Sequence, residues 1–155
     1  MAAKTQALAA LERAGVTHRV HEYAHDPRAP SYGLEAAEKL GVDPARVLKT
    51  LVVAGDGRLL VAVLPAEAQL DLRALGKRAS LADPGLAERT TGYVTGGISP
   101  LGQRRRLPTL VDESALGFGT VYVSGGRRGL EIELAPADLI ALLGAEVRRI
   151  AAARP

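Results

Sequence analysis

The feature that most constrains the fold is a β-hairpin signal near the middle of the chain. Residues 47–54 are rich in valine and leucine, and residues 58–64 form a second run of the same kind. Asp56-Gly57 lies between the two runs, and this dipeptide is preferred in two-residue hairpin turns because both positions there require positive φ. The sequence therefore predicts two antiparallel strands joined by a tight turn.

Helices and strands alternate along the rest of the chain. Apolar residues at helical spacing, polar capping residues and terminal glycines predict helices, whereas short β-branched runs predict strands. The predicted helices are 4–14, 31–40, 71–79, 83–92 and 136–144, and the further predicted strands are 16–23, 107–112, 120–124 and 130–134. Asp43-Pro44 starts a short helical turn, and residues 95–102 form a glycine-rich connection. The secondary structure of residues 145–150 is ambiguous. We expect one domain over residues 1–155, of α/β (α+β) class, with a mixed sheet.

The amino-acid composition limits the classes of protein to which this chain can belong. The chain has 155 residues, 47% hydrophobic and 24% charged, which suits one folded domain. It has no cysteine, so disulfides, thiolate metal sites and a cysteine nucleophile are excluded. Aromatic residues make up only 3%, too few for a base-stacking platform, and the net charge of +3 permits a polyanionic partner. No secretory signal and no apolar run of membrane-spanning length is visible, so we expect a soluble cytoplasmic protein.

The segment from His21 to His25 matches the H-E-x-x-H pattern of zinc proteases. That chemistry requires a helix, which places both imidazoles on one face beside the glutamate. Here the preceding residues favour a strand, and Pro27 follows where a helix would have to continue. We therefore expect no metal site.

Lys49 stands out inside the first hairpin strand. Strand alternation puts it on the same face as Val47, Leu51 and Val53. The chain has 4 lysines against 16 arginines, so a lysine in a strand suggests a need for a compact charge or a titratable amine. The alternative is a lysine that protects a strand edge from aggregation, and the sequence leaves both interpretations open.

Glycines and arginines form a second group of candidate site residues. Residues 91–102 contain four glycines, whose backbone amides could approach an oxyanion or a phosphate, although a plain turn is the default interpretation. The segment matches neither the P-loop nor the dinucleotide fingerprint. Two arginine groups follow glycine loops and could contact phosphates or simply be solvated: Arg104, Arg105 and Arg106, and Arg127 and Arg128.

Several motifs together resemble the YbaK family of aminoacyl-tRNA deacylases, in its Cys-tRNA(Pro) deacylase branch. The resemblance covers nearly the whole chain. The motifs that carry it are His21-Glu22-Tyr23-Ala24-His25-Asp26-Pro27, Val47-Leu48-Lys49-Thr50-Leu51, Gln69-Leu70-Asp71-Leu72, Ala82-Asp83-Pro84, Thr91-Gly92-Tyr93, residues 96–103, Tyr122-Val123-Ser124-Gly125-Gly126 and Arg128-Gly129-Leu130.

The resemblance implies both a fold and an activity. The fold would be that of the YbaK/prolyl-tRNA synthetase editing domain, a mixed sheet curled into a barrel-like core with flanking helices. The activity would be cleavage of the ester that joins cysteine to tRNA(Pro) after prolyl-tRNA synthetase has charged it wrongly. Cys-tRNA(Cys) would be an additional substrate. No metal or cofactor is implied, since the substrate thiol attacks its own ester. The partners would be the acceptor end of the tRNA and, transiently, prolyl-tRNA synthetase.

The resemblance also assigns roles to individual residues. The catalytic residues would be Lys49, Tyr23 and Gly97. The residues that bind substrate would be Thr50, Gly96, Ile98, Ser99, Gly102 and Glu131, although relatives carry aspartate where this chain has Glu131. The residues that bind tRNA would be Arg104, Arg105, Arg106, Arg127 and Arg128.

Two alternatives remain. One is a catalytically silent module that binds RNA or docks on a synthetase. The other is an editing enzyme for a different amino acid, because related branches remove alanine from tRNA(Pro). Thr50 after Lys49 favours the cysteine branch, since the alanine branch is associated with asparagine at that position.

Overall fold

The computed structural model describes residues 4–152, and its helices begin and end where the capping residues predict. Thr5, Ser31 and Asp83 each accept a backbone hydrogen bond at a helix start, and every α-helix is followed by a glycine with φ between 57° and 83°. The helices are α1 (Gln6–Ala14), α2 (Tyr32–Leu40), α3 (Pro84–Thr91) and α4 (Pro136–Leu143), with the shorter 3-10 helices η1 (Pro44–Arg46), η2 (Leu72–Leu75) and η3 (Glu113–Gly117).

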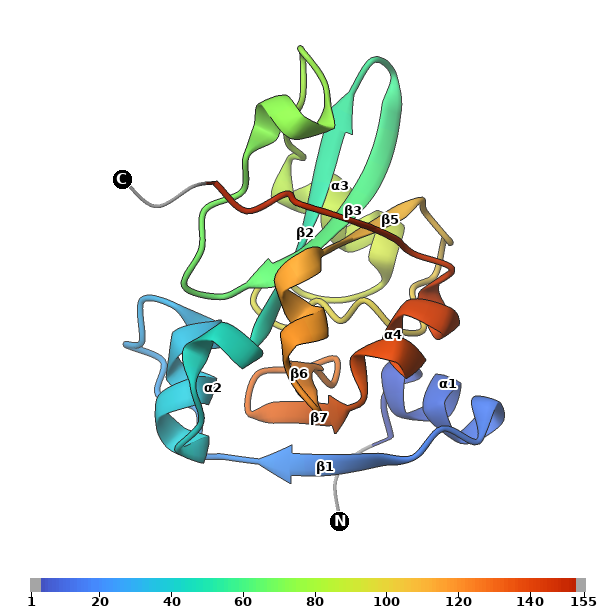
Figure 1. The fold of residues 1–155 in the computed structure, drawn as a ribbon. Coiled ribbons are helices and arrows are strands. Elements are labelled where there is room, and N and C mark those ends of the chain that lie inside the picture. Colours follow the sequence, from blue (N-terminus) through green and yellow to red (C-terminus); the bar gives the residue numbers. More distant parts are fainter. Residues whose placement is uncertain (1–3, 153–155) are drawn as a thin grey trace.

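The strands of the described chain form two sheets (Figure 1). The smaller sheet is antiparallel in the order β1 (His18–Glu22), β7 (Leu130–Leu134), β6 (Val121–Ser124). The larger sheet is mixed, in the order β4 (Ser80–Leu81), β2 (Leu48–Gly55), β3 (Arg58–Pro65), β5 (Thr109–Asp112), β8 (Glu146–Arg148), with parallel pairing of β3 with β5 and of β5 with β8. The predicted α/β class with a mixed sheet is confirmed.

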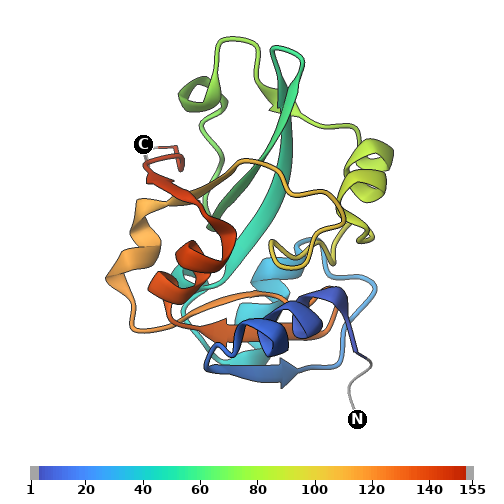
Figure 2. The same cartoon turned by 90° about the vertical axis from the view of Figure 1, so that its right-hand side faces the viewer.

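The predicted hairpin is confirmed in detail. β2 and β3 are antiparallel with Lys49 opposite Leu64 and Gly55 opposite Arg58. Both turn residues have positive φ, 51° at Asp56 and 73° at Gly57, as a two-residue turn requires. The turn lies at the far end of the molecule from β1 in both views (Figure 2).

Two predictions about secondary structure need correction. The predicted helix over residues 71–79 is wrong: only η2 forms, it ends at Gly76, and Ser80–Leu81 pairs with β2 instead. Leu72 and Leu75 pack against the hydrophobic cluster around Leu64, so tertiary contacts decide this segment. The ambiguous segment 145–150 contains β8.

The two sheets meet where β2 begins, and this junction positions the site. An isolated parallel bridge joins Val47 to Tyr122, next to the small sheet. Ala36 and Ala37 of α2 pack on these two residues. The sheets are separate in residues 4–152, so the structure shows no closed barrel.

The hairpin has apolar side chains on both faces. Leu48, Val52, Val61 and Val63 belong to the main core, while Val53, Ala62 and Leu64 belong to a second cluster beneath η2. Strand alternation produces this division, so Lys49 and Thr50 point to opposite faces of β2. Between residues 4 and 152, none of the helices has the length and apolar character needed to cross a membrane.

Candidate functional site

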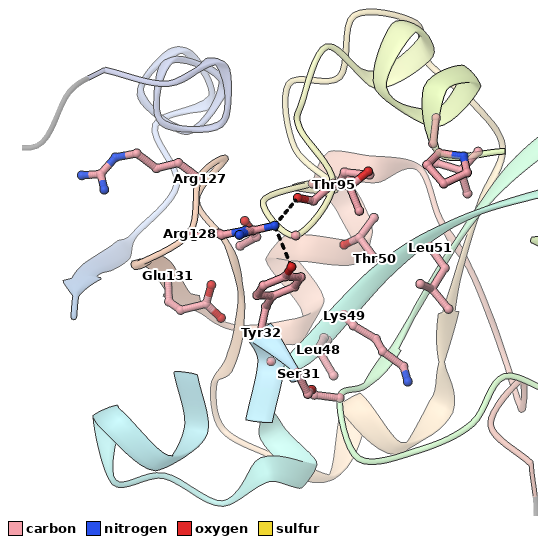
Figure 3. Close-up of a pocket in the computed structure, with 18 of the residues that line it drawn as sticks. Ser31, Tyr32, Leu48, Lys49, Thr50, Leu51, Thr95, Arg127, Arg128 and Glu131 are labelled. Atoms are coloured by element: carbon pink, nitrogen blue, oxygen red, sulfur yellow. Dashed lines mark hydrogen bonds between the residues drawn. The ribbon is translucent and has the colours of Figure 1, made fainter. Parts of the chain in front are cut away.

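The main cavity has a volume of about 340 Å³ and lies where the start of β2 faces the small sheet and the N-terminus of α2. Residues from widely separated parts of the chain line it, and Figure 3 shows ten of them by name. The predicted site residues that line it are Tyr23, Lys49, Thr50, Gly96, Ile98, Arg127, Arg128 and Glu131. Residues separated by more than a hundred positions in the sequence are thus brought to one place.

A second hollow, of about 660 Å³, lies near Pro65, Gln69 and Asp112. Its buried acid is already satisfied: Asp112 accepts hydrogen bonds from the backbone nitrogens of Ile150 and Ala151, each at 2.9 Å, and from Ser114. The second hollow therefore offers less unused chemistry than the main cavity, although it is larger.

Glu131 is the most unusual group in the main cavity. It lies on β7, is only 6% exposed, and its carboxyl makes no hydrogen bond or ion pair with any residue of the described chain. Burial raises its pKa from the ordinary 4.5 to about 8, because a carboxylate loses hydration inside a protein. At neutral pH the side chain is thus mostly a neutral acid that can donate a hydrogen bond.

Tyr23 and Thr50 are two further polar residues that line the main cavity. Burial, and secondarily the charge of Glu131, raise the pKa of Tyr23 to about 12, so its hydroxyl stays protonated. The Thr50 hydroxyl oxygen is buried and has no hydrogen-bond partner. Buried polar groups usually have partners, so this cavity contains hydrogen-bonding capacity that the described chain does not use.

Lys49 is among the residues that line the main cavity, but its amine is bonded to a backbone carbonyl. The Nζ atom donates a hydrogen bond to the carbonyl oxygen of Ala68 at 2.5 Å, and Figure 3 shows it turned away from Glu131 and Arg128. Burial lowers the pKa of the amine. Within the described strands of the large sheet, Lys49 has a paired neighbour on β3 alone, because β4 pairs with Val53 and Ala54 of β2. The cavity and the strand-edge interpretations of Lys49 thus both stay open.

Arg128 is exposed and yet fixed at the mouth of the main cavity. Its Nη2 atom donates to the hydroxyl of Tyr32 at 2.6 Å and to the carbonyl of Thr95 at 3.2 Å, and its guanidinium lies 4.0 Å from the centre of the Tyr32 ring. The three contacts join α2, the loop after α3 and the β6–β7 turn (Figure 3). Sequence reasoning missed Tyr32 and Thr95, because their only link to Arg128 is spatial.

The glycine loop approaches the β6–β7 turn closely. A side chain at Gly96, whose φ is 91°, would place its Cβ 2.6 Å from Nε of Arg128, and one at Gly97 would lie 2.9 Å from Cα of Arg127. Only glycine permits this approach. Gly97, Ser99 and Gly102 do not line the main cavity; Ser99 is fully buried and accepts from the Leu101 nitrogen, and Gly102 packs on Gln6.

The two arginine groups lie in different surroundings. Arg127 and Arg128 line the main cavity, and Arg127 also forms an ion pair with Glu22 at 3.7 Å. Arg104, Arg105 and Arg106 are exposed and do not line it. The structure thus brings only the second group to the cavity.

The two histidines of the H-E-x-x-H match are engaged by different carboxylates. His21 lies in β1 and its Nε2 atom is 2.9 Å from Glu133, whereas Nδ1 of His25 is 2.6 Å from Glu35. Burial opposes ionisation of Glu35, but hydrogen bonds from His25 and the Asp26 nitrogen outweigh it and hold its pKa below the usual value. Within residues 4–152, no three histidine or acidic side chains are grouped as metal ligands would be.

Comparison with known proteins identifies relatives that span the whole chain. A family model described as the aminoacyl-tRNA editing domain matches residues 27–142. EbsC of Enterococcus faecalis, named as a candidate Cys-tRNA(Pro)/Cys-tRNA(Cys) deacylase, is 35% identical over 153 residues, which cover 95% of this chain and 93% of EbsC.

Two further comparisons concern prolyl-tRNA synthesis. A proline–tRNA ligase of Acidithiobacillus ferrooxidans is 33% identical over 88 residues, 54% of this chain and 15% of the ligase. The crystal structure of a candidate trans-editing enzyme for prolyl tRNA synthetase superposes with a TM-score of 0.85 and 29% identity, covering 96% of both chains.

Proposed function

Since the chain belongs to the aminoacyl-tRNA editing domain family, we propose that it removes cysteine wrongly esterified to tRNA(Pro) by prolyl-tRNA synthetase. EbsC is named as a deacylase and the solved structure as a trans-editing enzyme, and the chain is an aminoacyl-tRNA deacylase. The choice of cysteine and of tRNA(Pro), with Cys-tRNA(Cys) as an additional substrate, is the proposal. Cysteine and proline are similar in size, so a synthetase pocket separates them poorly and a second site is needed.

The observation that carries the proposal is a cavity with polar binding groups but no activated nucleophile. Among the described residues that line it there is no histidine. The Ser124 hydroxyl donates to the carbonyl of Gly97 at 3.2 Å. The Thr95 hydroxyl is hydrogen-bonded to Glu88, but the backbone and side-chain hydrogen bonds from Thr95 hold the pKa of that carboxyl below its usual value, which makes it a weak base. A nucleophile supplied by the substrate fits this arrangement, because activation of a serine or threonine requires an adjacent base.

The reaction we propose begins with the substrate thiol. Its sulfur forms a bond to the ester carbonyl carbon, the bond from that carbon to the ribose oxygen breaks, and the thiol proton passes to the ribose oxygen. Water then opens the cyclic thioester to free cysteine. The negative charge that develops on the carbonyl oxygen needs a donor, and Lys49 can supply one if its amine exchanges Ala68 for the substrate.

Contacts to the RNA are proposed for the cavity mouth. Arg127 and Arg128 would bind phosphates of the acceptor end, since both lie where a 3′ terminus must pass to bring its ester inside. Gly96 and Ile98 would form the wall beside the ester, and Gly97, Ser99 and Gly102 would hold that loop in position. Prolyl-tRNA synthetase is proposed as a transient partner that delivers the mischarged tRNA.

Single-turnover deacylation of Cys-tRNA(Pro), Ser-tRNA(Pro), Ala-tRNA(Pro) and Cys-tRNA(Cys) tests the proposal. We expect the serine ester to react far more slowly than the cysteine ester, because a thiol with a pKa of about 8.5 ionises near neutrality and a hydroxyl does not. Equal rates for serine and cysteine would indicate an activated water, and a preference for alanine would indicate the alternative editing activity. Binding without turnover of any ester would indicate a silent module.

A further inference from the structure

The unpaired carboxyl of Glu131 indicates a specific contact with the substrate. Its residue is 6% exposed and lines the main cavity, and Figure 3 shows its carboxyl on the side of the residue that faces Tyr32. No residue of the described chain gives it a hydrogen bond or an opposite charge. A carboxyl that has lost most of its hydration and has no protein partner is destabilised, and a group of the substrate that enters the main cavity can supply that partner.

Most polar groups around Glu131 are committed to other partners, whereas the Thr50 hydroxyl, which also lines the main cavity, has no hydrogen-bond partner. On the neighbouring strands, His21 contacts Glu133 at 2.9 Å and Ser124 donates to Gly97. On the α2 side, His25 contacts Glu35 at 2.6 Å. Of the cations that line the main cavity, Arg127 pairs with Glu22, Arg128 with Tyr32 and Thr95, and Lys49 with Ala68. Tyr23, which stays protonated, is the remaining titratable neighbour.

The chemistry of an aminoacyl ester limits what can occupy this position. A phosphate would repel the ionised form of Glu131, and a thiol is a weak hydrogen-bonding group. The α-amino group is a strong partner, since an ammonium donates to a carboxylate in a charge-assisted hydrogen bond. Burial raises the pKa of Glu131 to about 8, into the range of α-amino groups, so an amine that enters the cavity can take up the proton of the acid as the pair forms.

We propose that Glu131 binds the α-amino group of the esterified amino acid, so that a free amine is required for cleavage. This inference rests on the proposed function and adds a selection rule to it. Aminoacyl ends whose nitrogen is acylated, as in formylated or peptidyl-tRNA, would be rejected because an amide nitrogen is neither basic nor able to carry the charge that pairs with the carboxylate.

The test compares two esters of the same tRNA(Pro). One carries cysteine and the other carries 3-mercaptopropionate, which has the same thiol and ester but no amine and is no larger. Each enzymatic rate is divided by the rate of hydrolysis in buffer, because the amine also activates the ester chemically. We expect wild type to prefer the cysteine ester by about 10- to 100-fold after this correction, the value of one charge-assisted hydrogen bond.

Two variants assign the preference to one side chain. Glu131→Gln replaces the neutral acid by a group of the same shape, and the preference is expected to fall below about 3-fold. Glu133→Gln is the matched control, because Glu133 lies two residues further along β7 but is bonded to His21 and Thr120 and does not line the main cavity. Its preference is expected to equal that of wild type.

The outcomes separate this inference from the proposed function. Cleavage of both esters by wild type with equal corrected rates would overturn the role of Glu131 while leaving cysteine editing intact. A wild-type preference that persists in Glu131→Gln would also overturn it. Failure of wild type to cleave the cysteine ester would overturn the proposed function, and this inference with it.

Discussion

Replacing Glu131 by glutamine is expected to remove a pH dependence from the stability of the protein. In the unfolded chain this carboxyl loses its proton near its ordinary pKa of 4.5, whereas in the folded protein it retains the proton up to about 8. Between these values the folded state binds more protons than the unfolded state, so the free energy of unfolding falls as the pH rises. Below about 4.5 and above about 8, the contribution of Glu131 no longer changes.

The magnitude follows from the width of this interval. Each pKa unit corresponds to about 1.36 kcal/mol, so an increase from 4.5 to about 8 corresponds to at most about 5 kcal/mol. Glutamine cannot ionise, so Glu131→Gln should match wild type near pH 5 and should be more stable than wild type by several kcal/mol at pH 8.

Urea unfolding of wild type and Glu131→Gln at pH 5, 6, 7 and 8 measures this difference directly. Subtracting the two curves removes the contributions of Glu35, Asp112 and Glu133, whose pKa values lie below their ordinary values and which stay ionised throughout the range. Parallel curves for the two proteins would refute the reasoning, since they would show that Glu131 ionises in the folded state as readily as in the unfolded one.

Three further predictions concern the other residues of the main cavity. Lys49→Ala should lower the free energy of unfolding by about 1 kcal/mol, because the hydrogen bond to Ala68 is lost. The rate of single-turnover deacylation should fall by roughly 30- to 1000-fold. A folded variant with the wild-type rate would leave Lys49 a structural role only. Replacing Arg127 and Arg128 by alanine should reduce the slope of log affinity for tRNA against log salt concentration by about 2. An unchanged slope would show that both arginines are solvated surface residues. The same measurement on alanine variants of Arg104, Arg105 and Arg106 decides whether they contact RNA. Tyr32→Phe removes the hydroxyl that accepts a hydrogen bond from Arg128 at 2.6 Å. The KM should rise several-fold, with little change in kcat or in the melting temperature. A KM equal to that of wild type would contradict a positioning role for Tyr32.

Features fixed by neighbouring residues were predictable from the sequence. The Asp56-Gly57 turn, the cap at Ser31 and the glycine after each α-helix are local, and the structure confirms all of them. The helix expected over residues 71–79 failed because Leu72 and Leu75 pack on a distant cluster. Local pattern alone could not reveal that contact.

The site was predictable only in part, for the same physical reason. The resemblance selected Glu131, but its burial without a partner depends on α2 and on the loop at Gly96, which no pattern near residue 131 describes. The strand that carries Lys49 was predicted, but the position of its amine depends on the carbonyl of Ala68 beyond the hairpin. Tyr32 was missed because its partner, Arg128, follows 96 residues later.

The pairing of β1 has a consequence for a chain that is still being synthesised. β1 is an edge strand of the small sheet, and in the described part of the chain it pairs with β7 alone. A ribosome must therefore make more than a hundred further residues before His18–Glu22 can find its partner. The partner strand β7 also carries Glu131. A nascent or truncated chain that ends before β7 therefore has neither a complete small sheet nor the buried acid. The amine contact proposed for Glu131 therefore requires a chain that has been synthesised through β7.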